Sequence, residues 1–170
     1  EVTPPPAARA LFLIDGGSDV LLTGDETGLA TPAEDMLHLR SVLDGVDASL
    51  KTVLCKGVNV DCGHGIVQAE LDERLAQLER EGAMLFLERL DEKHSSTGKA
   101  RTDAEFYSRV VGRCDPSQSI VQSLVVASIE GKRGYDVVPP HLHARIGKRS
   151  RVPLTDQTAT VYAFDLNHVA

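Results

Sequence analysis

The chain has 170 residues, of which 42% are hydrophobic and 25% charged, and its formal net charge is −7. This composition is typical of one globular domain with its own core and excludes disordered and fibrous proteins. The negative charge argues against nucleic-acid binding, because phosphates would be repelled. No apolar run approaches the ~18 residues of a membrane-spanning helix, and three cysteines without a signal peptide argue against a disulfide framework. We therefore expect a soluble, cytoplasmic protein with no membrane or nucleic-acid partner.

The amino-terminal residues have the composition of a linker, with Thr3-Pro4-Pro5-Pro6-Ala7 after a first residue that is not Met. We expect residues 1–9 to be a linker and residues 10–170 to form a single α/β domain, the C-terminal part of a longer chain. The composition is compatible with a small-molecule ligand and with a homo-oligomer.

Apolar runs alternate with helical periodicity in the first half of the chain. The runs expected as strands are 10–14, 52–55 with 57–60, and 83–87. The helices expected between them begin at the capping box of Thr31 and Glu34, ending at Gly45, and cover 67–78, ending at Gly82. Because the runs 10–14 and 83–87 are continuously apolar, these strands are expected to be buried on both faces. The alternating order predicts parallel pairing, and thus an α/β fold, a Rossmann-like three-layer sandwich with a mostly parallel sheet.

The second half of the chain is more polar. Residues 90–101 show no periodicity, which predicts a mobile surface loop and a candidate lid. Two helices are expected after it, one from the capping box Thr102-x-x-Glu105 and one from Asp115-Pro116 to Gly131. A last strand is expected over 158–166.

The segment from Asp15 to Asp35 is the best candidate site. It places carboxylates in a glycine-bearing loop between the end of a strand and the start of a helix, the edge at which open α/β sheets bind ligands. We expect catalytic or metal-binding roles for Asp15 and Asp19, with a divalent cation such as Mg²⁺ as the candidate cofactor. The residues expected to contact a ligand here are Gly16, Gly17, Asp25 and Glu26. The alternative is that these side chains only cap turns, and no known phosphate-loop motif is present.

A second loop, Gly57 to Gly65, follows the next expected strand. A parallel sheet would bring Asp61 and His64 to the same edge as Asp15, where they are candidate catalytic residues. Cys55 and Cys62 with His64 do not have a recognised zinc spacing and lack a fourth ligand. A role for Cys62 as a nucleophile is a further alternative.

Charge is unevenly distributed along the chain. Acids dominate before residue 36, whereas bases dominate from Lys132 to Arg151. In the basic segment, Arg145 and Arg149 are candidate anion contacts after His141-x-His143, although a solvated basic face is the more common meaning of such a run. The remaining histidines are interpreted as ordinary residues: His38, His94 and His168.

Several blocks together resemble a family of archaeal and bacterial proteins known as domain of unknown function 1152. They are Ile14 to Leu21, Gly24-Asp25-Glu26 with Gly28, Thr31 to Met36, Gly57 to Asp61 with His64-Gly65, Val152-Pro153-Leu154, and Tyr162 to Leu166 with Val169-Ala170. The chain departs from the family at residues 155–158, where a more apolar block is expected. The resemblance implies a further glycine-rich strand and loop, absent here, upstream of these blocks. It implies no activity.

Together these features favour an enzyme that acts on a small phosphorylated or nucleotide-type metabolite through the acidic loop. A non-catalytic metabolite-binding or assembly module is the alternative, because the same loop can recognise a ligand without chemistry. A purely structural loop is the third interpretation.

Overall fold

The structure, a computed structural model, describes residues 8–24, 26, 28, 32–46, 48–63, 65–91, 98–115, 119–135, 138–146 and 152–169. The strands are β1 (Ala8–Asp15), β2 (Ala48–Lys56), β3 (Met84–Arg89) and β4 (Thr160–Asp165). The α-helices are α1 (Pro32–Gly45), α2 (Gln68–Arg80), α3 (Gly98–Val111), α4 (Ile120–Ile129), α5 (His143–Ile146) and α6 (Leu166–Val169). Short 3-10 helices are η1 (Asp19–Leu21), η2 (Val60–Gly63), η3 (Pro140–Leu142) and η4 (Gln157–Ala159).

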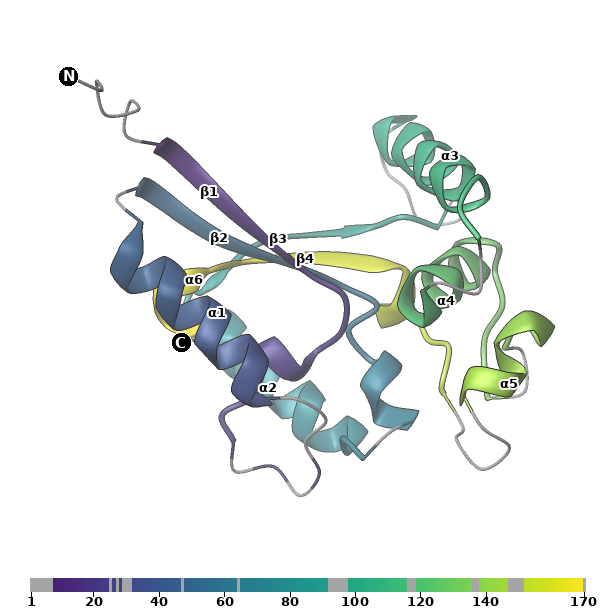
Figure 1. The fold of residues 1–170 in the computed structure, drawn as a ribbon, viewed down its shortest axis with the longest axis horizontal. Coiled ribbons are helices and arrows are strands. Elements are labelled where there is room, and N and C mark those ends of the chain that lie inside the picture. The colour runs from purple at the N-terminus through teal and green to yellow at the C-terminus, as the bar shows by residue number, and fades with distance from the viewer. Residues whose placement is uncertain are drawn as a thin grey trace.

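The strands form one mixed sheet in the order β1-β2-β4-β3 (Figure 1). Only β1 and β2 pair in parallel, and β4 pairs antiparallel with both β2 and β3. The expected Rossmann-like sandwich with a mostly parallel sheet is therefore wrong. The physical reason is that the last strand inserts between β2 and β3, and this long-range pairing leaves no mark in local periodicity. The carboxyl ends of β1 and β2 still meet at one edge.

Several boundaries differ from those expected. The second strand ends at Lys56, because Gly57 turns the chain with a φ of 67° and Val60 begins η2 instead of continuing the strand. Helix α3 begins at Gly98, four residues before the capping box of Thr102. Within the expected loop, residues 92–97 lie outside the described residues.

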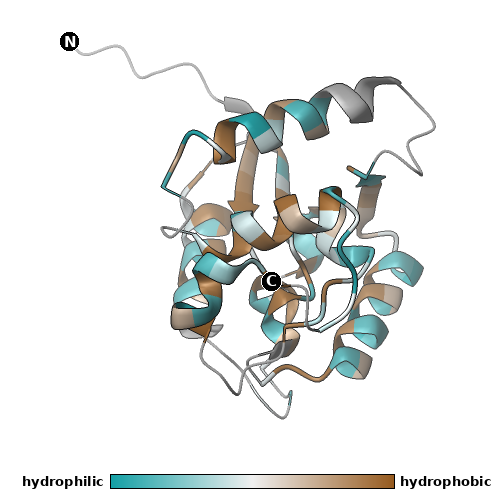
Figure 2. Cartoon of the chain, turned by 90° about the vertical axis from the view of Figure 1, so that its right-hand side faces the viewer, coloured by the Kyte–Doolittle hydropathy of each residue, from teal (hydrophilic) through white to brown (hydrophobic). Residues whose placement is uncertain are grey.

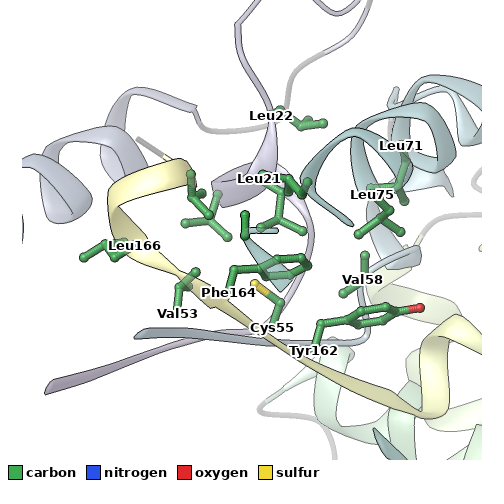
Figure 3. Packing of buried hydrophobic residues seen from close by; sticks show 14 of the residues in the cluster. Leu21, Leu22, Val53, Cys55, Val58, Leu71, Leu75, Tyr162, Phe164 and Leu166 are labelled. Atoms are coloured by element: carbon green, nitrogen blue, oxygen red, sulfur yellow. The ribbon is translucent and has the colours of Figure 1, made fainter. Parts of the chain in front are cut away.

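One face of the sheet is covered by α1, α2 and α6, which lie below the strands in Figure 1. Phe164 of β4 is fully buried at the centre of this core, close to Cys55 of β2 and beneath Leu21 of η1 (Figure 3). Helix α2 contributes the expected stripe of apolar residues to this core, namely Leu71, Leu75 and Leu78. Burial on this scale, at roughly 25 cal/mol per Å² of apolar surface, is the main force that holds η1 against the sheet.

The opposite face is largely open, and α3 covers it only at the right-hand end in Figure 1. Phe12 and Ile14 of β1 are 53% and 65% exposed, and Phe86 of β3 is also exposed. The expectation that both apolar strands are buried on two faces is thus wrong, since one layer of the sandwich is missing here.

A second, smaller core lies beside the sheet. Leu124 and Ala127 of α4 pack with Leu142 and Ile146 from the segment of η3 and α5. This core fixes α4 next to the carboxyl end of β2, where Val121 and Val125 contact the turn at Gly57 closely. No helix among the described residues is long and apolar enough to cross a membrane.

Candidate functional site

The loop after β1 is anchored in the core. Val20, Leu21 and Leu22 are buried, so η1 is held by its own apolar side chains. Arg74 of α2 is also buried, and its Nε donates a hydrogen bond of 2.7 Å to the carbonyl oxygen of Leu21. Arg74 thus holds the loop at a fixed depth, which sets the position of Asp19.

Four carboxylates, Asp15, Asp19, Asp35 and Asp61, converge near this loop, and we refer to them as the acidic cluster. Asp61 of η2 accepts hydrogen bonds from the Ser18 backbone nitrogen at 2.7 Å and from Ser18 Oγ at 3.0 Å. The two polar loops therefore meet at one edge, as parallel β1 and β2 require.

Gly17 is what lets the two loops approach so closely. A Cβ at this position would lie 2.6 Å from Asp61 Oδ2 and 3.3 Å from Asp19 Oδ1. Any larger residue would push these carboxylates aside.

Asp35 of α1 lies beside the buried Asp19. Burial raises the pKa of Asp35 to about 7, with further contributions from the charges of Asp19 and Asp15 and from a hydrogen bond to the Asp19 side chain. Such a bond needs one protonated carboxyl, because two ionised carboxylates repel each other. Near neutral pH Asp35 thus carries a titrating proton.

Asp15 lies at the end of β1 beside this pair. Burial raises its pKa to about 6, and the charge of Asp19 adds to the effect, whereas the backbone N–H of Gly16 lowers it. Its Oδ2 atom is buried and has no hydrogen-bond partner among the described residues. A cavity of about 60 Å³ opens at this point, lined by Asp15, Asp35 and His38 together with Leu13, Ile14 and Val20. The arrangement can hold and release a proton next to a small, partly open cavity.

The geometry does not provide a preformed metal site. Among the described residues, no group of three or more His, Cys, Asp or Glu side chains is placed to hold a metal ion. Binding of Mg²⁺ by Asp15 and Asp19 therefore stays a prediction. Burial also raises the pKa of the Cys62 thiol to about 12, which disfavours a thiolate nucleophile.

The other candidate residues are not part of the acidic cluster or lie outside the described residues. Glu26 accepts hydrogen bonds from the backbone nitrogens of Thr23 and Gly24, both at 2.8 Å, so it caps a turn. Gly16 lies against Val121 and Gln122 of α4. The remaining candidates that cannot be placed are Asp25, His64 and Arg149, which lie outside the described residues.

The basic segment is only partly described and does not meet the acidic cluster through the arginines that can be placed. Arg145 lies exposed on α5. Arg133 instead pairs with Asp91 at 2.9 Å and with Asp156 at 3.0 Å, and Arg89 of β3 pairs with the same two acids. This ion cluster joins β3, the end of α4 and the segment before β4. Its charges neutralise one another.

Three residues to which the sequence analysis gave no individual role lie at this edge of the sheet. Asp35 is the last residue of the candidate segment that begins at Asp15, but only its neighbours in that segment were given roles. His38 is one helical turn further along α1, a spacing that could have linked it to Asp35. Lys56 is a charged residue at the end of an apolar strand, the same signal that selects Asp15.

Comparisons with known proteins do not assign the chain to a family. No family model matches the chain, no similar curated protein was found, and no solved structure matches the fold. The resemblance to the domain of unknown function 1152 family stays a prediction.

Proposed function

We propose that this chain is an enzyme for a small phosphorylated or nucleotide-type metabolite, in which Asp15 and Asp35 act as general acid and base. The observation that supports it most is that two carboxyls of one cluster have pKa values of about 6 and about 7. An acid or base is most effective when its pKa lies near the working pH. A carboxyl that only caps a turn behaves differently, because its N–H partners lower its pKa, as they do for Glu26.

The crowding of carboxylates also supports a chemical role. Ser18 and Asp61 already link the two loops, and Arg74 already anchors η1, so the fold does not need an ionisable group at Asp15. A buried carboxylate with an oxygen that has no hydrogen-bond partner, such as Asp15 Oδ2, destabilises a protein. Residues that reduce stability without serving the scaffold are concentrated at functional sites.

The cavity beside Asp15 limits which part of a substrate the acids can reach. About 60 Å³ admits a hydroxyl, an amine or a water molecule. Repulsion by the carboxylates keeps a phosphate outside the cavity. In such a complex the ionised carboxyl accepts a proton from the group in the cavity, and the protonated carboxyl donates one.

The first test is a ¹³C NMR titration of the aspartate carboxyl groups. Asp15 and Asp35 are expected to titrate with midpoints near 6 and 7. Midpoints below about pH 5 for both carboxyls would remove the basis of the proposal, because such values are those of ordinary exposed acids.

The second test is a thermal-shift screen with sugar phosphates and nucleotides, each with and without Mg²⁺. A ligand of the acidic cluster should raise the melting temperature of the native protein and lose this effect in the Asp35→Asn variant. Asp44→Asn is the matched control, since Asp44 lies on the same helix, is exposed and pairs only with Arg40 at 2.7 Å in the described structure. A ligand shift that both variants keep would place the binding site elsewhere.

The alternative is a non-catalytic assembly module, and the open face of the sheet favours it. Phe12 and Ile14 of β1 and Phe86 of β3 are large apolar side chains exposed on this face, and apolar side chains gathered on a surface usually mark a protein contact. Analytical ultracentrifugation tests this function: a complex that dissociates in the Phe12→Ser/Ile14→Ser variant would support it, and a monomer at all concentrations would argue against self-assembly.

A further inference from the structure

Helices α3 and α4 form a pocket with the end of β2 that lies apart from the acidic cluster. It has a volume of about 390 Å³, within the range of small-molecule sites. Its wall is mainly apolar and comes from Phe106, Val110 and Val111 of α3, and Lys56 of β2 supplies the charge. Figure 2 shows the side of the molecule that carries these helices, with apolar and polar residues alternating along α3 at the top of the view. We refer to this feature as the Lys56 pocket.

Lys56 is the unusual group in this pocket. Cys55 points into the core, so the next residue, Lys56, points to the open face, as strand alternation requires. Its Nζ lies 5.8 Å from the centre of the Tyr107 ring, a distance that allows a cation–π contact. Across the described part of the chain, no side chain forms an ion pair or hydrogen bond with this ammonium.

The ammonium is also poorly solvated. Burial lowers the pKa of Lys56, and the charge of Asp15 on the other face only partly opposes this. A half-buried cation without a close counter-ion is stabilised by an anion that enters from solvent.

The polar groups around the pocket favour a single carboxylate over a phosphate. Tyr107 donates its hydroxyl proton to Gln122, and the Ser119 hydroxyl accepts from the Gln122 backbone nitrogen. The Ser119 hydroxyl keeps its own proton for a further hydrogen bond, and Lys56 is the one cation among the described lining residues. A phosphate dianion is usually held by several donors, often a bidentate arginine, whereas one ammonium and one hydroxyl match the two oxygens of a carboxylate.

We propose that the Lys56 pocket binds a small amphipathic monocarboxylate, whose carboxylate pairs with Lys56 Nζ and whose apolar body lies against Phe106, Val110 and Val111. Phe106 and Val110 are 61% and 45% exposed without a ligand, and their burial is the driving force for the apolar part. The charge sets the orientation of the ligand. This proposal does not rest on the acid–base function proposed above.

Calorimetric titration with octanoate and with octanol tests the proposal, because the two probes share an apolar chain and differ in charge. Octanoate is expected to bind the native protein more tightly than octanol. In Lys56→Met, which keeps the length of the side chain, octanoate affinity should fall roughly tenfold or more while octanol affinity is kept. Lys132→Met is the matched control, because Lys132 is an exposed lysine that follows α4 and pairs with Glu130 at 3.6 Å. It should leave both affinities unchanged.

Methyl NMR locates the ligand. Octanoate should shift the methyl signals of Val110 and Val111, and the Phe12→Ser variant on the open face should bind it as the native protein does. The proposal is overturned if octanoate does not bind, if octanol binds equally well, or if Lys56→Met keeps the octanoate affinity while its melting curve shows that it is folded. Loss of binding in Phe12→Ser alone would assign the ligand to the open face and would equally overturn it.

Discussion

The acidic cluster and the Lys56 pocket lie at the same edge of the sheet but on opposite faces of it. Asp15 pairs in register with Cys55 and shares its covered face, whereas Lys56, one residue later, faces α3 and α4. Burial shifts both groups toward their neutral forms, raising the pKa of Asp15 and lowering that of Lys56. Strand alternation thus separates two opposite charges that could have neutralised each other, and each is left available to a ligand.

The largest expected difference between the two faces is in how much the free energy of unfolding falls when an aromatic side chain is removed. Phe164 is fully buried on the covered face, whereas Phe12 on the open face is 53% exposed. We expect Phe164→Ala to lower the free energy of unfolding by about 3–5 kcal/mol, because it leaves a cavity. Phe12→Ala should cost about 0.5 kcal/mol or less, as surface substitutions do. Urea denaturation measures both, and a similar large loss for Phe12→Ala would mean that the open face is covered in solution.

The acidic cluster should make stability fall as pH rises. Because the pKa of Asp15 is raised from 3.8 to about 6 in the folded state, the folded protein holds a proton that the unfolded chain has released between these values. Stability therefore decreases from about pH 4 to about pH 7 and stays lower above it.

Removing the Asp15 charge should reverse this loss. At about 1.4 kcal/mol per pKa unit, Asp15→Asn should gain about 2–3 kcal/mol at about pH 8 and almost nothing near pH 4. Melting curves of both proteins across this range measure the difference. A gain that is equal at both ends would mean that the substitution acts through packing and not through charge.

The close approach at Gly17 should be intolerant of a methyl group. In Gly17→Ala the new Cβ would meet Asp61 Oδ2 at 2.6 Å, so the hydrogen bonds of Asp61 to Ser18 must break. The expected cost is about 1–3 kcal/mol, since a buried group loses its partner. Gly45→Ala is the control: no atom lies within 4 Å of the new Cβ, and stability should be unchanged or slightly higher. Octanoate binding at the Lys56 pocket should be the same in both variants.

The sequence predicted the local elements better than their assembly. The helices around 32–45 and 68–80 follow from capping residues and from apolar spacing, which are local signals. The position of β4 between β2 and β3 depends on residues more than 70 positions apart, as in the pairing of Met84 with Phe164, which periodicity does not encode. An apolar run also does not say whether a second layer covers it, so Phe12 and Ile14 were assigned to a buried strand.

The site was predicted in part for the same reason. Asp15 and Asp61 follow strand ends, and adjacent parallel strands bring such ends together whatever the rest of the sheet does. Asp35 was included in the candidate segment without a role of its own, and Lys56 was missed. Asp35 enters the site from the side of α1 that faces the loop, and helix packing alone determines that side. Lys56 has an individual role only because Gly57 ends the strand there and α3 packs above it, which is a tertiary contact.

The smallest expected effect is a coupling between the two faces. The Lys56 charge lowers the pKa of Asp15 and is not among the main contributions to that of Asp35. Lys56→Met should therefore raise the Asp15 midpoint by a few tenths of a pH unit and leave the Asp35 midpoint in place, as ¹³C titration would show. Octanoate bound at Lys56 should produce the same selective shift in the native protein, because it neutralises the same charge. By linkage, octanoate must then bind more tightly below the Asp15 midpoint than above it, by the same factor. An equal shift of both aspartates would instead indicate a general loosening of the acidic cluster, and the two faces would then not communicate through Lys56.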